Sequence, residues 1–384
     1  MNNTARSGLV PLALLFLKLG VIGFGGPAAH IAMMEDEVVK RRQWMTRQEF
    51  LDLVGATNLI PGPNSTEMAI HIGYIQGGLA GLIIGGVCFI GPAVIITGII
   101  AWFYSQYGTL PEVAPFFSGI QPIIIAVIIQ AVWQLGKKAL KKGLLWAIAT
   151  LVIVLVFLGV NEMVALLLGG ISGIIAQGLR LNFFLLGLTG GISLVKNPGA
   201  DNPPHLAQLG LFFLKVGSIL FGSGYVLVAF LQSELVNKYS WLTQQELLDA
   251  IAIGQFTPGP VLSTATFIGY QILGLPGAMI STIAIFFPSF IFVLLLNPLI
   301  PKIRQSKRAS AFLDAVNASA VALMVAVIIN LSHKALLQPM GIFPVNITAI
   351  FMTVLATILL IKYKVNSSWL IIGGALAGFL LESL

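Results

Sequence analysis

Long, uninterrupted runs of apolar residues dominate the pattern of this chain. Residues 77–104 and residues 116–135 each contain no charged side chain. A helix of about 20 apolar residues crosses the hydrocarbon core of a bilayer. Lipid offers the backbone no hydrogen-bond partners, so only helices and closed barrels span it. Barrel strands alternate apolar and polar residues, and these runs do not. The pattern therefore predicts an all-α integral membrane protein that crosses the cell membrane many times.

Composition strengthens this prediction. Of the 384 residues, 57% are hydrophobic and 9% are charged, and the mean hydropathy is +0.95. Soluble domains carry about 25% charged residues. The net charge of +7 comes from lysines and arginines in short loops, as expected of cytoplasmic loops, so we expect no nucleic-acid partner. The single cysteine, Cys88, excludes an intrachain disulfide and a cysteine-based zinc site.

The chain repeats itself. The sequence FLKLG at residues 16–20 recurs as FLKVG at residues 213–217, an offset of 197. The same offset aligns further positions: Glu37 with Glu234, Trp44 with Trp241, Thr46 with Thr243, Asp52 with Asp249, and Pro61-Gly62-Pro63 with Pro258-Gly259-Pro260. After one dropped residue, Ile72-Gly73-Tyr74 matches Ile268-Gly269-Tyr270. We predict two homologous transporter repeats, residues 1–195 and 206–384, joined by a polar linker at 196–205.

The charges of the loops predict how the two repeats are oriented. The first repeat has a basic loop at residues 137–142, whose counterpart near residues 332–341 is almost uncharged. The second repeat has its basic loop one span earlier, at residues 302–308, and the matching residues 105–112 contain no lysine or arginine. If both basic loops are cytoplasmic, the halves lie in opposite orientations. Inverted repeats of this kind are typical of secondary transporters.

Residues 46–74 are predicted to form a re-entrant helical hairpin. The basic residues 40–47 precede this segment, and two clear spans separate it from the basic loop at 137–142. The segment must then enter and leave by one face. Each arm has about 12–15 residues, which is too short to span, and the two prolines of Pro61-Gly62-Pro63 break the helix at the tip. The alternative is a surface helix followed by part of a spanning helix. We expect about five spanning helices and one hairpin in each half.

Two lysines lie inside apolar runs and are candidates for substrate binding. Lys18 and Lys215 are partners under the repeat, and charged residues within spans are usually functional. An inverted pseudo-twofold axis can bring them together near the bilayer midplane, where two ammonium groups would offset a small dianion. Alternatively, each lysine extends to the interface or pairs with a carboxylate of its own half, such as Asp52 or Asp249.

Glycine-rich stretches and hydroxyl side chains complete the candidate binding site. Glycines permit an unwound backbone, and a helix that starts there presents free N–H groups to an anion; close helix packing is the alternative. Hydroxyls after the hairpin tips can cap helices or donate to an oxyanion. The predicted binding residues, besides the two lysines, are Gly25, Gly26, Gly222 and Ser223 at the breaks and Ser65, Thr66, Ser263 and Thr264 after the tips.

The acidic residues divide into two groups. Asp52 and Asp249 are candidates for proton coupling, whereas Thr46–Glu49 and Thr243–Glu246 are typical of helix capping boxes. Glu67 and His71 are four residues apart, a spacing that suits a metal, but no further ligands cluster nearby in the sequence. We therefore expect neither a metal nor a cofactor.

These motifs resemble those of the chromate ion transporter family. The first half carries F-x-K-x-G-x-x-x-F-G-G-P, then W-x-T-x-x-E-x-x-D and P-G-P, and the second half carries F-G-S-G-Y and T-P-G-P followed by F-I-G-Y. The resemblance is to the long-chain members with two halves. It implies a carrier that exports chromate, with sulfate as the close analogue, and a phenotype of chromate resistance.

Other functions are alternatives to the one that this resemblance implies. An anion channel, or an importer of sulfate or another small anion, would use the same architecture. A membrane-embedded enzyme is disfavoured, because the sequence has no nucleophile–base pair, zinc signature or nucleotide-binding loop. The four histidines are scattered, and none recurs in the repeat. The expected partners are the lipid bilayer and a small oxyanion, and a homodimer is an open alternative.

Overall fold

The computed structural model describes residues 8–108, 110, 113–178, 204–221, 224–296, 306–336 and 347–382. All regular secondary structure in these ranges is helical. Four of the helices within these ranges are long and apolar enough to cross a membrane by length and composition: 64–107, 115–139, 261–295 and 308–332. The all-α membrane architecture predicted from the apolar runs is thus confirmed.

The described helices of the first half are, in chain order, α1 (Leu9–Ile22), α2 (Gly26–Glu35), a π-helix (Asp36–Arg41), α3 (Arg47–Thr57), α4 (Asn64–Tyr107), α5 (Ala114–Ala139), α6 (Gly143–Phe157) and α7 (Glu162–Gly178). The second half has α8 (Leu206–Ile219), α9 (Leu227–Leu231), a π-helix (Gln232–Lys238), α10 (Gln244–Phe256), α11 (Thr264–Leu296), α13 (Lys307–Leu336), α14 (Ile347–Ile361) and α15 (Ser367–Glu382). The order of elements therefore repeats, including the uncommon π-helix.

Irregular backbone conformations also recur between the halves. Gln43 and Ser240, which are 197 residues apart, have φ values of 52° and 53°. Gly78 and Gly274 each have a φ of 61°. Positive φ is uncommon for residues other than glycine, so two independent segments would not share these positions by chance. The internal repeat read from the sequence is a repeat of the fold.

Helix α4 folds back on itself at Gly78. The φ and ψ of this residue are 61° and −143°, a region that glycine adopts far more cheaply than other residues. A short arm, residues 64–77, then packs against a long arm, residues 79–107. A Cβ on Gly85 of the long arm would lie 2.7 Å from the carbonyl oxygen of Ala69 on the short arm. Small residues make this close packing possible.

The helix-break-helix predicted for residues 46–74 is present. Helix α3 and the short arm of α4 flank Pro61-Gly62-Pro63. The 11 residues of α3 extend for about 16 Å, which is about half of the hydrocarbon core. Its capping box is also present, since the Glu49 N–H donates to Thr46 Oγ1 at 3.2 Å and the Thr46 N–H donates to the Glu49 carboxylate at 2.8 Å. The second half repeats this arrangement, with a capping box at Thr243.

The chain does not merely unwind at the glycines after the first helix, as the sequence suggested. The Lys18 Nζ lies 2.7 Å from Glu37 Oε1, although a continuous helix would separate these residues by about 28 Å. The chain therefore reverses between α1 and α2. Gly25, with a φ of 101°, precedes α2. Left-handed glycines here turn the chain instead of only unwinding it, so each arm is short and the first half contains a second helical hairpin.

The two halves run in opposite directions. Thr97 Oγ1 donates to Ser263 Oγ at 3.3 Å, and Gln271 Nε2 donates to the Ala101 carbonyl oxygen at 3.0 Å. The long arm of α4 and the short arm of α11 are therefore aligned in the same direction. The turn at Gly78 then lies at one end of the long arm of α4, and the turn at Gly274 lies toward the other. This geometry agrees with the inverted repeat predicted from the loop charges.

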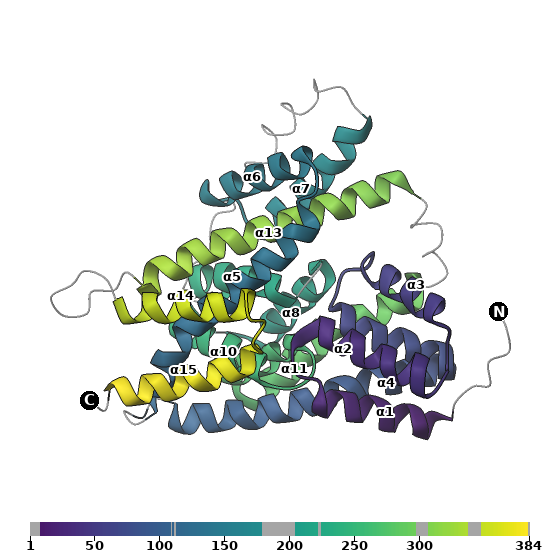
Figure 1. The fold of residues 1–384 in the computed structure, drawn as a ribbon, viewed down its shortest axis with the longest axis horizontal. Coiled ribbons are helices and arrows are strands. Elements are labelled where there is room, and N and C mark those ends of the chain that lie inside the picture. Colours follow the sequence, from purple (N-terminus) through teal and green to yellow (C-terminus); the bar gives the residue numbers. More distant parts are fainter. Residues whose placement is uncertain are drawn as a thin grey trace.

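The halves are intertwined. Helices α6 and α7 of the first half pack along α13 of the second, while α14 and α15 of the second half pack along α5 of the first (Figure 1). Across the centre, α4 contacts α11 and α5 contacts α13. One buried cluster joins apolar residues of both halves. Most of the linker predicted at 196–205 lies outside the described residues, so the division into residues 1–195 and 206–384 stays a prediction.

Candidate functional site

Each hairpin tip lies against the break that follows the first helix of the opposite half. The first tip is Pro61-Gly62-Pro63 and the second is Pro258-Gly259-Pro260; the first break follows α1 and the second follows α8. The Gly62 N–H donates to the Leu220 carbonyl oxygen at 2.6 Å, and the Gly259 N–H donates to the Gly23 carbonyl oxygen at 2.7 Å. A Cβ on Gly259 would lie 2.9 Å from the Cβ of Ala93, which is at the midpoint of the long arm of α4. The prolines on either side of each tip glycine break the helix and expose this backbone. The second tip and the first break thus meet at mid-height of the long arm of α4.

His30 connects the first break to the first tip. Its Nε2 lies 2.9 Å from the Gly23 carbonyl oxygen, and its Nδ1 lies 3.2 Å from Ser65 Oγ. A carbonyl only accepts, so Nε2 carries the proton and Ser65 donates to Nδ1. The ring is 1% exposed. The sequence did not single out His30, because its repeat counterpart is Leu227.

The first tip carries buried polar atoms that form no hydrogen bond within the described chain. They are Asn64 Oδ1, Thr66 Oγ1, both carboxylate oxygens of Glu67, both ring nitrogens of His71, and Ser289 Oγ from α11. Glu67 and His71 are 0% exposed. In folded proteins the large majority of buried polar atoms are paired. This cluster is therefore suited to a ligand or to a change of protonation.

The second tip is different, because its hydroxyls are satisfied within the protein. Ser263 Oγ accepts from Thr97, and Thr264 Oγ1 donates to the Val261 carbonyl oxygen at 2.7 Å. Thr257 Oγ1 donates to the Gly254 carbonyl oxygen at 3.4 Å. The two tips share a sequence pattern, but polar side chains are unpaired at the first tip and hydrogen-bonded at the second. The halves are therefore chemically unequal at the centre.

The predicted glycine breaks are only partly described. Gly25 and Gly26 have φ values of 101° and 76°, and α2 begins there without a side-chain cap. Its first-turn N–H groups therefore have no side-chain acceptor at the N-cap, and the positive end of its dipole lies at the break. Gly222 and Ser223 lie outside the described residues.

The structure does not place the two lysines at the tips. Lys18 forms an ion pair with Glu37 of its own half, which is the kind of pairing the sequence left as an alternative, although with a different carboxylate. Its hydrogen bond lowers the pKa of Glu37, which lies in the π-helix outside the long spanning helices. Lys215 lies on an exposed part of α8, one turn after Leu211, which is 66% exposed. A shared lysine site stays a prediction.

The two aspartates occupy unlike environments. Asp249 on α10 is 1% exposed and accepts a hydrogen bond of 2.8 Å from the Tyr104 hydroxyl on α4, so it links the two halves. Asp52 on α3 is half-buried and lies 3.4 Å from Gln48 Nε2 on the same helix. The repeat equates them in sequence, but only Asp249 is enclosed. Their role in proton coupling stays a prediction.

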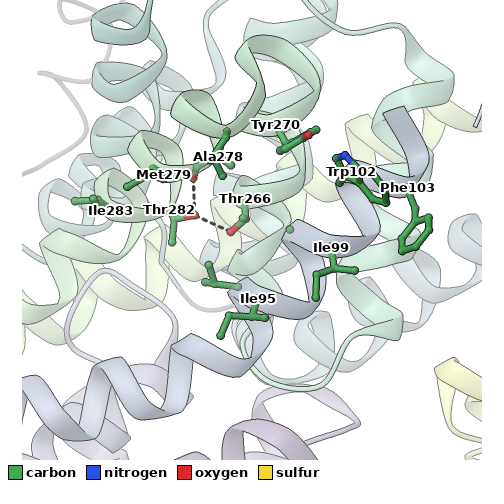
Figure 2. Close-up of a pocket in the computed structure, with 13 residues that line it drawn as sticks. Ile95, Ile99, Trp102, Phe103, Thr266, Tyr270, Ala278, Met279, Thr282 and Ile283 are labelled. Atoms are coloured by element: carbon green, nitrogen blue, oxygen red, sulfur yellow. Dashed lines mark hydrogen bonds between the residues drawn. The ribbon is translucent and has the colours of Figure 1, made fainter. Parts of the chain in front are cut away.

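A separate cavity of about 690 Å³ opens between α4 and α11. Figure 2 shows Ile95, Ile99 and Trp102 on one side and Met279 and Ile283 on the other. Its lining is almost wholly apolar, and the hydroxyls of Thr266 and Thr282 bond to each other at 2.7 Å. Ile95 and Met279 are 64% and 58% exposed. Such a surface suits lipid chains and offers an oxyanion few polar groups, so we place the candidate site at the tips.

Comparison with known proteins gives a consistent result. The sequence profile of the family described as "Chromate transporter" matches residues 10–174 and 207–379. The chain is 31% identical over 373 residues to the chromate transport protein of Cupriavidus metallidurans, covering 95% of this chain and 90% of the relative. It is 30% identical over 341 residues to a probable chromate transport protein of Synechococcus elongatus, covering 85% and 86%. An uncharacterised transporter of Methanocaldococcus jannaschii is 30% identical over 331 residues, covering 82% of each chain. No solved structure matches this chain.

Proposed function

Because the chain belongs to the chromate transporter family, we propose that it is a secondary carrier that exports chromate across the cell membrane by alternating access. Sulfate, a tetrahedral dianion of similar shape, is the proposed second substrate. Inverted repeats exchange conformations around a site at their interface. The two tips and two breaks lie at that interface, and the backbone hydrogen bond that each tip donates to a break joins one half to the other. A rocking motion of one half against the other would open these contacts alternately.

The oxyanion is proposed to bind between the first tip and the first break, which His30 connects. The start of α2 supplies backbone N–H donors from Gly25 and Gly26 and the positive end of a helix dipole. Ser65 and Thr66 supply hydroxyls from the same half. From the other half, Ser263 accepts from Thr97 and can donate its own proton, whereas Thr264 would first have to release its hydrogen bond to the Val261 carbonyl oxygen. Gly222 and Ser223 are proposed as the matching donors of the second break.

Lys18 and Lys215 are proposed to act at longer range. Lys18 precedes Gly23 by five residues, which corresponds to about 7.5 Å of helix. A charge at this separation still attracts an anion, since the Debye length at physiological salt is about 8 Å and low-dielectric surroundings weaken screening. The lysines would raise the local anion concentration without contacting it. Alanine at either position is expected to abolish transport in protein that still inserts.

The observation that carries this proposal is the unpaired polar cluster of the first tip at the interface between the halves. We would measure the uptake of labelled sulfate and chromate into liposomes that contain the purified protein. Thr66→Ala is expected to weaken the apparent affinity by about tenfold, as for a lost hydrogen bond to a charged group. Thr150→Ala is the matched control, because its hydroxyl is exposed and bonds only to Trp146 of its own helix.

Absence of uptake of either anion by folded protein would remove the substrate assignment. A carrier is distinguished from an anion channel by counterflow, since unlabelled anion inside the liposomes accelerates labelled uptake only through a carrier that alternates. Liposomes with the protein sealed in one orientation would separate export from import.

A further inference from the structure

Glu67 occupies the centre of the first tip. Gly62 has no side chain, and a Cβ built there would collide with Glu67 Oε1 and lie 2.7 Å from Ser289 Oγ of α11. The carboxyl group therefore fills the space between the tip backbone and the opposite half. The Gly62 N–H beside it holds the cross-half hydrogen bond to Leu220. Any change in the charge of Glu67 acts directly on this contact.

The surroundings of Glu67 offer no compensating charge. The side chain is 0% exposed, and none of the ion pairs among the described residues includes it. Two titratable groups belong to the same tip: His71, one turn later on the same helix, and His30, which reaches Ser65 from α2. Helix α11 contributes the neutral Ser289. An unpaired carboxylate in such a place is strongly disfavoured relative to a protonated carboxyl.

We propose that Glu67 is a proton-binding site whose occupancy is linked to oxyanion binding at the first tip, so that one proton accompanies each anion through the protein. This rests on the proposed function and names its coupling residue. An ionised Glu67 would repel a dianion held at the tip, whereas the protonated carboxyl is neutral and can donate a hydrogen bond to it. The carboxylate takes a proton from the solution on the side where the anion enters and returns it where the anion leaves.

The proposed coupling residue has no titratable counterpart in the second half. At the offset of 196 that applies after the dropped residue, Glu67 corresponds to Ser263 and His71 to Phe267. Neither of these titrates, and Ser263 is already bonded to Thr97. Asp249 is the other enclosed carboxylate of the interface, but the Tyr104 hydroxyl donates to it. Its negative charge is therefore better supported than that of Glu67.

The test is the pH dependence of sulfate affinity in liposomes with equal pH on both sides. Sulfate is used because its own charge does not change between about pH 6 and about pH 9, the range in which buried carboxyls have been found to ionise. In the wild type the affinity is expected to fall by up to about tenfold per pH unit above the ionisation of the site. Glu67→Gln is expected to bind sulfate with an affinity that no longer depends on pH. Asp314→Asn, which removes an exposed carboxylate on α13, is expected to keep the wild-type dependence.

A direct measurement covers the case in which Glu67→Gln does not fold. Adding sulfate to wild-type protein in a weakly buffered detergent solution is expected to remove protons from the solvent, which an indicator dye records. The proposal is overturned if Glu67→Gln keeps the wild-type pH dependence, if sulfate binding takes up no proton, or if uptake depends on sodium at constant pH instead. Absence of any sulfate or chromate flux in the wild type is a different outcome, which overturns the proposed function itself.

Discussion

Replacing Gly259 with alanine tests the central contact between the halves. Gly259 has a φ of 89°, and its N–H donates to the Gly23 carbonyl oxygen at 2.7 Å. A Cβ there would lie 2.9 Å from the Ala93 Cβ and 3.3 Å from the Gly20 carbonyl oxygen. The substitution therefore adds backbone strain and a steric clash at one position, without changing charge or polarity.

The expected loss in free energy of unfolding has three parts. A positive φ costs about 1–2 kcal/mol for an alanine. Forcing one extra methyl group into a packed site costs about 1–3 kcal/mol. If the tip moves away to relieve the clash, the hydrogen bond to Gly23 is lost, at about 1 kcal/mol. We expect a destabilisation of about 3–6 kcal/mol, together with loss of sulfate transport.

Alanine substitutions at two further glycines separate the cost of backbone strain from the cost of the steric clash. Gly274 has a φ of 61°, but no atom lies within 4 Å of the position that an alanine Cβ would take, so Gly274→Ala should show the strain alone. Gly91 lies within helix α4 with open space around it, so Gly91→Ala should be neutral or stabilise by up to about 1 kcal/mol. Unfolding of the three variants in detergent would be followed by heat and by denaturant. The reasoning fails if Gly259→Ala is no less stable than Gly274→Ala, since the tip would then not be packed against α4.

Three other substitutions test separate contacts. Tyr104→Phe removes the donor to buried Asp249 and should cost about 1.5–3 kcal/mol; a double-mutant cycle with Asp249→Asn measures the coupling, and a value near zero contradicts the contact. Thr46→Ala should cost about 1 kcal/mol through loss of the helix cap. The backbone and side-chain hydrogen bonds from Thr46 lower the pKa of Glu49, so this stabilisation is present above the ordinary glutamate pKa and is lost as the pH falls through the lowered value. Alanine keeps the backbone hydrogen bond, and the lost cap of the Glu49 N–H does not titrate. The difference in thermal stability between wild type and Thr46→Ala should therefore narrow in acid without vanishing. Lys18→Ala should change the free energy of unfolding by less than about 1 kcal/mol, because the lysine side chain is 49% exposed, but should abolish sulfate uptake; normal uptake would remove the lysine from the site.

Much of the fold was accessible from local chemistry in the sequence. Proline and glycine at the tips, threonine and glutamate three residues apart at the helix starts, and charges in the loops each have short-range physical effects. These predicted the hairpin, both capping boxes and the opposed halves. The reversal between α1 and α2 was not accessible, because glycine permits both an unwound helix and a complete turn. Only the sign of φ at Gly25 distinguishes them, and tertiary packing sets that sign.

The candidate site was harder to predict because its contacts are long-range. The sequence repeat aligned the first tip with the second tip. It did not indicate that the backbone of each tip donates a hydrogen bond to the break of the opposite half. His30 was missed because it has no counterpart in the second half. Glu67 and His71 were noticed for their spacing alone, which suggested a metal. Their complete burial without partners, which now carries the coupling proposal, is a property of the folded interface.

The exchanged packing of the two halves has a consequence for biosynthesis. Helices α6 and α7 are complete at residue 178, but their partner α13 ends at residue 336. At about 5–20 residues per second, the ribosome delivers that partner roughly 10–30 s later. Through this interval the first half sits in the bilayer with its packing surface covered only by lipid or by a chaperone. Slowing translation within the second half should therefore raise the share of chains that are degraded before they assemble.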